Sequence, residues 1–181
     1  MTQDTSSYPP LVVVMGVSGC GKSTVGEALA RRLDVAFTDG DDLHPPANVE
    51  KMRAGTPLDD DDRWPWLDAV GGWLAERRTS GGVVACSALK RAYRDRLRDQ
   101  APAAVHVHLH GDRELIGRRQ AARGQHFMPP GLLDSQFATL EPLGVDEAGV
   151  VLDVALGVDE LVEAAYDALT RTAPGSETQE P

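Results

Sequence analysis

The clearest chemistry in the sequence belongs to residues 16–23, GVSGCGKS, which match the phosphate-binding pattern G-x-x-x-x-G-K-S. Glycines let successive backbone N–H groups turn toward a phosphate without a Cβ in the way. Lys22 can reach the β- and γ-phosphates, and Ser23 can offer its hydroxyl to Mg²⁺. The pattern predicts a site for Mg²⁺ with ATP or GTP, formed by Gly16, Val17, Ser18, Gly19, Cys20, Gly21, Lys22, Ser23 and Thr24.

The segments around this loop favour that interpretation over a chance match. An apolar run, LVVVM at 11–15, comes directly before the loop, and a segment with helical spacing, residues 22–33, follows it. Strand, loop and helix therefore occur in the order that the motif requires. The helix N-terminus adds partial positive charge at the same place.

Two carboxylates follow the next apolar run, in TDGDDLHPP at 38–46. Asp39 and Asp41 are two residues apart, so they share one face of an extended segment. A kinase acting on an alcohol needs one carboxylate near the acceptor hydroxyl and another near Mg²⁺, and we assign Asp41 and Asp39 to these roles respectively. The alternative is a solvated turn in which Asp41 or Asp42 caps the next helix. The phosphate-binding loop favours the catalytic interpretation.

Basic residues gather in CSALKRAYRDRLR at 86–98, after the third apolar run. Lys90 and Arg94 are four residues apart and lie on one face of the predicted helix, where they would attract an anionic substrate. An exposed basic helix paired with Asp95 and Asp99 explains the pattern equally well. The sequence leaves these two interpretations open.

Arginines also precede a stretch interrupted by Gly and Pro, RRQAARGQHFMPP at 118–130. Arg119 and Arg123 share a helix face, and arginines on a mobile segment can close over the γ-phosphate during phosphoryl transfer. We therefore predict a helical lid at about residues 119–138. The alternative is that these arginines only complement the helix dipole.

The acidic run at 59–62 predicts a structural role, whereas the arginine that follows it predicts a role in substrate binding. Helix N-termini favour carboxylates, so the run predicts helix capping rather than a metal site. Arg63 is placed to clamp a substrate carboxylate with two parallel bonds. Cys20 lies near a helix N-terminus but has no base nearby, so we assign it no catalytic role.

Three histidines alternate with apolar residues and therefore lie on one face of a strand: His106, His108 and His110. This arrangement raises the possibility of a zinc site. Because no further ligand is obvious, we prefer a polar strand face that is partly exposed or covered by a helix.

The elements that position these groups alternate between strand and helix along the chain. Apolar, β-branched runs predict strands at 11–15, 35–38, 82–86, 105–109 and 150–154. Helical spacing predicts helices at 22–33, 46–54, 63–79, 88–99, 112–122, 130–138 and 158–171. We predict one α/β domain over residues 10–171, a three-layer α/β/α P-loop kinase fold with a five-stranded parallel sheet and a helical lid. Residues 1–9 and 172–181 are predicted to be flexible ends.

Composition excludes some classes of partner. The 181 residues carry a formal charge of −10, which disfavours nucleic acid or an anionic membrane as the general surface partner. No segment approaches the roughly 20 apolar residues of a membrane helix. The two cysteines show neither zinc spacing nor a disulfide pattern, which predicts a reducing, cytoplasmic setting.

Four segments together resemble the gluconate kinase family, the thermoresistant type within the group of nucleoside-monophosphate and shikimate kinase-like enzymes. The segments are GVSGCGKST at 16–24, DGDDLHPPANVEKMRAGTPLDDDDRWPWL at 39–67, CSALKRAYRDRLR at 86–98 and RGQHFMPPGLLDSQFATLE at 123–141. The second is the most specific, because the phosphate-binding loop alone occurs in very many proteins.

The resemblance implies transfer of the γ-phosphoryl group of ATP to the 6-hydroxyl of D-gluconate, with Mg²⁺ required. It implies that Asp41 orients or deprotonates the hydroxyl and that Asp39 contacts Mg²⁺ through water. The substrate group implied by the resemblance comprises Asp41, His44, Arg63, Lys90, Arg94 and His126. Arg119 and Arg123 would serve the lid, and a homodimer is the usual assembly of the family.

Two other functions compete with this one. A related kinase for shikimate, another sugar acid or a nucleoside monophosphate would also need the basic residues, and the 39–67 segment argues for gluconate. A nucleotide-dependent regulatory switch would need neither the paired carboxylates nor the basic third helix.

Overall fold

The computed structural model describes residues 8–122 and 130–171. Its centre is a sheet of five strands in the order β2-β3-β1-β4-β5, and each neighbouring pair is parallel. The strands are β1 (Leu11–Met15), β2 (Ala36–Asp39), β3 (Gly82–Ala85), β4 (Val105–His110) and β5 (Gly149–Asp153). The predicted α/β fold with a five-stranded parallel sheet is confirmed.

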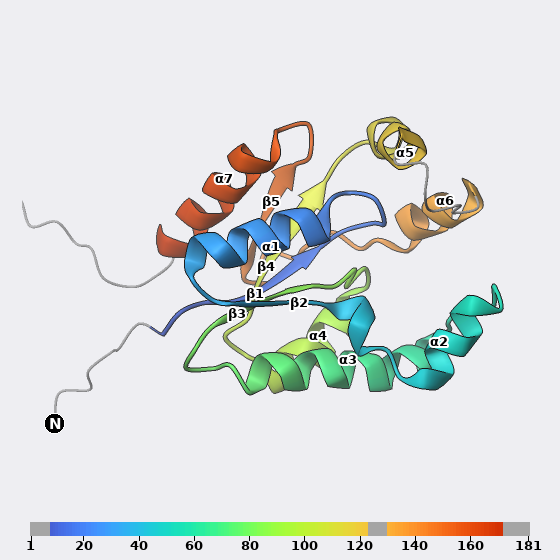
Figure 1. Cartoon of the computed structure of the whole chain (residues 1–181), viewed down its shortest axis with the longest axis horizontal. Coiled ribbons are helices and arrows are strands. Elements are labelled where there is room, and N and C mark those ends of the chain that lie inside the picture. The colour runs from blue at the N-terminus through green and yellow to red at the C-terminus, as the bar shows by residue number, and fades with distance from the viewer. Residues whose placement is uncertain (1–7, 123–129, 172–181) are drawn as a thin grey trace, which may run out of the picture.

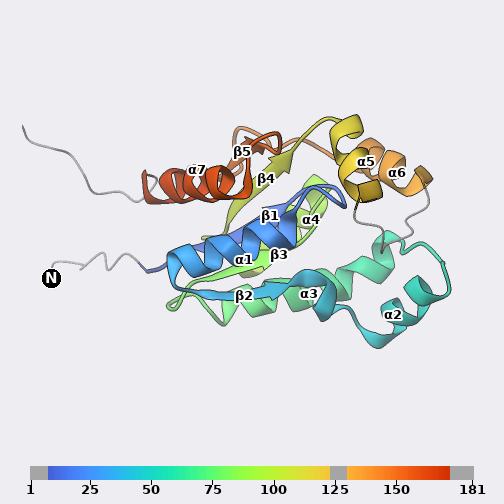
Figure 2. The same ribbon diagram turned by 45° about the horizontal axis from the view of Figure 1, so that its top comes forward.

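Helices cover both faces of the sheet, as Figure 1 shows. The α-helices are α1 (Lys22–Leu33), α2 (Pro46–Arg53), α3 (Asp60–Ala75), α4 (Arg91–Gln100), α5 (Arg113–Ala122), α6 (Pro130–Thr139) and α7 (Val158–Arg171), and a 3₁₀ helix, η1, spans Gly40–Leu43. Helices α1 and α7 pack on one face, while α3 and α4 pack on the other. Figure 2 shows α5 and α6 on one side of the carboxyl ends of the strands and α2 on the other.

Two helices begin elsewhere than predicted. The third helix was expected at 63–79 but spans Asp60–Ala75, because Asp59 caps it and forms a reciprocal capping box with Asp62. The fourth was expected to begin at residue 88 but begins at Arg91. Ala88 has a φ of 44°, a left-handed conformation that no α-helix contains, so the helix starts after it.

The alternating side chains of β1 divide the core into two layers. Val12 and Val14 face α1 and α7, whereas Val13 and Met15 face α3 and α4. Every residue of β1 is buried, as expected for the central strand of a parallel sheet covered on both sides. No helix in the described part of the chain is long and apolar enough to cross a membrane.

The histidines of β4 lie in the second layer and differ in burial. His106 pairs in register with Val13 and His108 with Met15, and both imidazoles are buried, whereas His110 is exposed. Among the residues that the structure describes, His106 Nε2 and both ring nitrogens of His108 have no hydrogen-bond partner. Within 8–122 and 130–171, no three potential ligands group to hold a metal ion, so the structure gives no support to the zinc site.

Burial lowers the pKa of both His106 and His108 to about 4, and the positive charge of Arg94 adds to the shift. We therefore expect the free energy of unfolding to be fully retained above pH 6.5, the ordinary histidine pKa, and to fall as the pH drops toward 4. The reason is that these histidines take up protons in the unfolded chain before they do so in the folded one.

Urea titrations at a series of pH values from 7.5 to 4.5 would measure this effect. His108→Leu should flatten the decline relative to the wild type, because one proton fewer is taken up on unfolding. His110→Gln is the matched control on the same strand face. In this variant the free energy of unfolding should fall more steeply with decreasing pH than it does in His108→Leu. Equal slopes for His108→Leu and the wild type would contradict the prediction.

Candidate active site

The phosphate-binding loop runs from the end of β1 to the start of α1. Gly16 adopts a φ of 144° and lies so close to β4 that an added Cβ would be 2.7 Å from the carbonyl oxygen of Leu109. Gly21 caps α1 in a left-handed conformation, with a φ of 102°. Backbone conformations with such positive φ values strain residues that carry a side chain, so the turn itself requires glycine at both positions.

Two polar side chains of the loop have partners within the site. Lys22 folds back across the loop, where its Nζ donates to the carbonyl oxygen of Val17 at 3.1 Å. Ser23 donates its hydroxyl to Asp39 Oδ2, which joins the start of α1 to the end of β2. The structure therefore brings Ser23 and Asp39 together, the two residues predicted to serve the metal ion.

Asp39 also fixes the backbone that carries Asp41. The other oxygen of Asp39, Oδ1, accepts from the backbone N–H of Asp41 at 3.0 Å and caps η1. The alternative in which Asp41 or Asp42 caps the next helix is thus not observed, since α2 begins after Pro45. Asp41 therefore contributes its backbone N–H, and not its side chain, to the capping of this turn.

The carboxyl of Asp41 is electrostatically distinct. Although Asp41 is an exposed residue, protein atoms around its carboxyl displace water and raise its pKa, and the nearby charge of Asp39 raises the pKa further. The positive charge of Lys22 acts in the opposite direction, which also shows that the lysine lies near. A raised pKa makes Asp41 a better proton acceptor than an ordinary aspartate.

The turn that carries Asp41 is held by Trp66 and Asn48, which the sequence did not single out, and by His44, a predicted substrate residue. Trp66 of α3 donates its indole N–H to the carbonyl oxygen of Gly40 at 2.7 Å. His44 stacks on the same indole, with the ring centroids 4.4 Å apart. Asn48, which is buried, contacts His44 Nδ1 at 3.3 Å. The spacing WPW after an acidic run was the available signal for Trp66, but a buried aromatic side chain suggests only core packing.

A second polar group connects the first turns of α3 and α4. Lys90 caps α4 and donates to Asp60 Oδ2 at 2.8 Å, while Tyr93 donates its hydroxyl to Asp60 Oδ1. Arg63 Nη1 contacts the Tyr93 hydroxyl at 3.4 Å. The predicted substrate residues Lys90 and Arg63, distant in the sequence, are therefore neighbours here. We call Asp60, Arg63, Lys90 and Tyr93 the Asp60 cluster.

The ion pairs divide the basic residues near the start of α4 and along it into two groups. Arg91 and Arg98 of α4 both bond to Asp95, and Arg96 bonds to Asp68 of α3. These arginines form the surface ion pairs of an exposed basic helix, whereas Lys90 belongs to the Asp60 cluster.

Arg94 does not lie in the site as predicted. Its side chain is 1% exposed and pairs with the equally buried Glu147, with 2.7 Å between Nε and Oε1. The guanidinium also donates to the carbonyl oxygens of Ala88 and Pro142. Lys90 precedes the helix rather than sharing a face with Arg94, so the two side chains diverge. We correct the prediction: Arg94 is a structural residue that joins α4 to the segment before β5.

A hollow of about 410 Å³ opens beside the phosphate-binding loop. Arg119, which was predicted to serve the lid, is one of the residues that line it. The full lining is Gly19, Cys20, Gly21, Thr24, Val25, Arg119, Ala122, Leu156, Gly157, Val158 and Leu161. The predicted residues Arg123 and His126 lie outside the described residues, as does part of the predicted lid.

Helices α5 and α6 also contact the loop directly, which the sequence analysis did not anticipate. Gln120 Nε2 donates to the carbonyl oxygen of Ser18 at 2.8 Å, and Gln136 Oε1 accepts from the backbone N–H of Ser18 at 2.6 Å. The predicted lid region therefore meets the phosphate-binding loop at Ser18.

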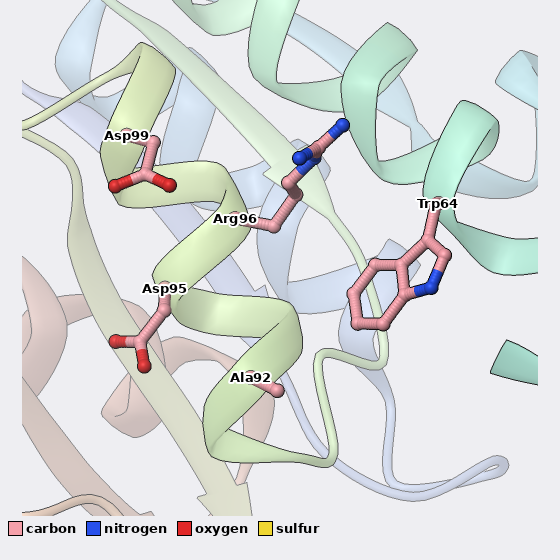
Figure 3. A pocket seen from close by; sticks show the side chains of 5 residues that line it. All are labelled: Trp64, Ala92, Asp95, Arg96 and Asp99. Atoms are coloured by element: carbon pink, nitrogen blue, oxygen red, sulfur yellow. The ribbon is translucent and has the colours of Figure 1, made fainter. Parts of the chain in front are cut away.

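Another hollow, also of about 410 Å³, lies between α3 and α4 and is shown in Figure 3. Its lining is Trp64, Ala92, Asp95, Arg96 and Asp99. None of these is a predicted site residue, so we place the candidate active site at the phosphate-binding loop.

Known proteins match this chain over most of its length. A family model described as an AAA domain matches residues 11–143. A gluconokinase of Gluconobacter oxydans is 51% identical over 141 residues, covering 77% of this chain and 79% of the relative. The thermoresistant gluconokinase of Escherichia coli is 42% identical over 164 residues, covering 89% and 94%.

A solved structure agrees with these relatives. The crystal structure of a gluconokinase from Sinorhizobium meliloti superposes with a TM-score of 0.84 at 50% identity, covering 92% of this chain and 94% of the other. The resemblance carried by the four sequence segments is confirmed, and the chain belongs to the gluconokinase family.

Proposed function

We propose that this protein transfers the γ-phosphoryl group of ATP to the 6-hydroxyl of D-gluconate, giving 6-phospho-D-gluconate and ADP. The observation that carries the proposal is the position of Asp41. This carboxylate, with its raised pKa, lies near Lys22 of the phosphate-binding loop on a turn fixed by Asp39. The choice of gluconate as the acceptor rests on relatives, up to 51% identical, that are named gluconokinases.

ATP has a suitable site at the loop. The backbone N–H groups after Gly16 and the N-terminus of α1 suit the phosphates. The hollow beside the loop offers Leu156, Val158 and Leu161 as apolar surface for the adenine ring. Arg119 lines the same hollow, and we propose that it stabilises negative charge on the phosphates.

The acceptor site is proposed between Asp41 and the Asp60 cluster. Arg63 and Lys90 supply positive charge for the carboxylate of gluconate. At the other end of the substrate, Asp41 orients the hydroxyl and accepts its proton as the oxygen attacks the γ-phosphorus. His44 is near both regions, because the charges of Asp41 and Arg63 both act on its pKa.

The residues present fit Mg²⁺, which prefers oxygen ligands. The Ser23 hydroxyl would bind the ion directly and Asp39 through water, and these oxygens already meet in a hydrogen bond. When bound, Mg²⁺ neutralises charge on the β- and γ-phosphates.

Roles for Arg123 and His126, a homodimer and a cytoplasmic location remain predictions.

Release of ADP from Mg-ATP, measured with a panel of acceptors, tests the proposed function. We expect D-gluconate to stimulate turnover strongly and shikimate, glucuronate and AMP to have little effect. Lys22→Met is the inactive control, because it removes the charge that reaches the phosphates. Stimulation by another acceptor would keep the kinase and overturn gluconate as its substrate. Binding of ATP without stimulation by any acceptor would favour the regulatory switch.

Asp41→Asn tests the proposed proton acceptor. The substitution preserves the size of the side chain and the backbone N–H that bonds to Asp39, so the turn should persist. We expect kcat to fall by about 10²-fold or more, because general base assistance is lost. The KM for ATP should change little. Steady-state kinetics at saturating gluconate would measure both.

The neighbouring Asp42→Asn is a matched control for this variant. Asp42 is exposed and its carboxylate accepts no hydrogen bond from the described residues, so its loss should leave kcat within about twofold of the wild type. An Asp41→Asn enzyme with the kcat of the wild type would remove Asp41 from the mechanism.

A further inference from the structure

Asp60 is an acidic residue that its helix does not need as a cap. The N–H groups at the start of α3 have other partners: Asp59 Oδ1 accepts from the backbone N–H of Asp62 at 2.9 Å, and Asp62 Oδ2 accepts from the backbone N–H of Asp59 at 3.2 Å. The acidic pattern by itself predicts capping by the whole run 59–62. The structure divides it: two residues cap the helix, and Asp60 turns toward α4 instead.

The carboxylate of Asp60 is the centre of its cluster. Lys90 Nζ lies 3.0 Å from Oδ1 and 2.8 Å from Oδ2, so one ammonium group bridges both oxygens. Tyr93 donates its hydroxyl to Oδ1, and Arg63 Nη1 lies 3.9 Å from the same oxygen. The hydrogen bonds from Lys90 and Tyr93 lower the pKa of Asp60, so the carboxylate stays charged at neutral pH.

A purely structural tie between α3 and α4 is a weak explanation for this arrangement. The two helices already pack through buried Leu67, Val70 and Leu97 and share the Arg96–Asp68 ion pair. Asp60 is 44% exposed and Lys90 is 34% exposed, and ion pairs that solvent reaches contribute little stability. Cations left accessible in this way remain able to bind an anion.

The charges of the cluster suit a substrate with one negative charge. Arg63 and Lys90 contribute two positive charges and Asp60 one negative charge, which leaves a net charge of +1. Lys90 has three N–H donors, and Asp60 occupies two of them. A single incoming carboxylate would neutralise the set and find donors on both cations.

The ring of Tyr93 packs against two neighbouring side chains. Trp64, which reaches from α3 toward α4 in Figure 3, meets the ring of Tyr93 edge-on with 5.7 Å between the centroids. Lys90 Nζ lies 5.3 Å from the centroid of the same ring. Tyr93 therefore has a fixed place, from which its hydroxyl contacts both Asp60 and Arg63.

The cluster is also connected to the proposed chemistry. Burial lowers the pKa of His44, and the charge of Arg63 lowers it further, whereas the charge of Asp41 raises it. Arg63 is thus close enough to act on the residue that lies beside Asp41. The charges of Asp41 and Arg63 therefore both act on one side chain, His44.

We propose that Asp60 is a positioning residue of the acceptor site. It holds Lys90 directly and Arg63 through Tyr93, so that their remaining donors face the carboxylate of the acceptor, and it sets the charge of the site to suit a polyhydroxy monocarboxylate rather than a phosphate dianion. This inference rests on the proposed function.

Kinetics of Asp60→Asn test the proposal. The substitution keeps the shape of the side chain but weakens its hold on Lys90, so the KM for D-gluconate should rise about tenfold with kcat within about threefold. The KM for ATP should not change. Asp61→Asn removes an equal charge from the same helical turn at an exposed position without a cationic partner in the described chain, and it should leave all three constants unaltered. An unchanged KM for gluconate in Asp60→Asn would overturn the proposal.

A double-mutant cycle separates positioning from general damage. If Asp60 acts through Lys90, then Asp60→Asn should raise the KM little further in a Lys90→Met background. If the increases in KM from the two single substitutions multiplied in the double variant, the two residues would act independently and the proposal would be overturned. A fall in kcat and in thermal stability that accompanies the rise in KM would indicate a structural role and would also overturn it. Tyr93→Phe, which removes only the hydroxyl on Asp60, provides a second variant and should raise the same KM in part.

The wild-type enzyme distinguishes failure of this inference from failure of the proposed function. Selective turnover of gluconate by the wild type together with a normal KM in Asp60→Asn would reject only the role of Asp60. Selective turnover of AMP by the wild type would reject both, since the site would then favour a dianion.

Discussion

The parallel pairing of β3 between β1 and β2 is the constraint on which the site depends. Ala85 is in register with both Val14 of β1 and Asp39 of β2. The segments that follow these three strands therefore begin next to one another at the same edge of the sheet. The backbone N–H of Gly16 then donates to the carbonyl oxygen of Ser87 at 3.3 Å, which ties the phosphate-binding loop to the segment before α4. Three regions far apart in the sequence meet because parallel strands end at the same edge.

Two polar contacts to aspartates add links that the sheet alone does not provide. The bond from Ser23 to Asp39 links the loop to the acidic turn, and the bond from Lys90 to Asp60 links α4 to α3. Both pairs are partly open to solvent, so they order the site without contributing much to stability. Asp41 lies near Lys22 on the acidic turn, and loss of surrounding water raises its pKa, which suits a proton acceptor.

Residues of one type acquire different roles from their burial. Arg94 is enclosed and pairs with Glu147, because an unpaired charge inside the protein would be very costly, whereas Arg63 stays accessible and close to His44. The histidines differ in the same way: His106 is buried in the core beside β1, and His44 stacks at the site. Sequence patterns record residue type and spacing but not depth.

The sequence by itself determined the phosphate-binding loop, the five strands and the family, because a loop motif and apolar periodicity are local properties of the chain. It also predicted that Lys90 and Arg63 would serve one substrate. Only the tertiary structure decided that Arg94 is enclosed and that Asp60 joins the cations. The physical reason is that burial and pairing across α3 and α4 depend on how helices pack on the sheet, and helical spacing alone cannot distinguish an exposed arginine from an enclosed one.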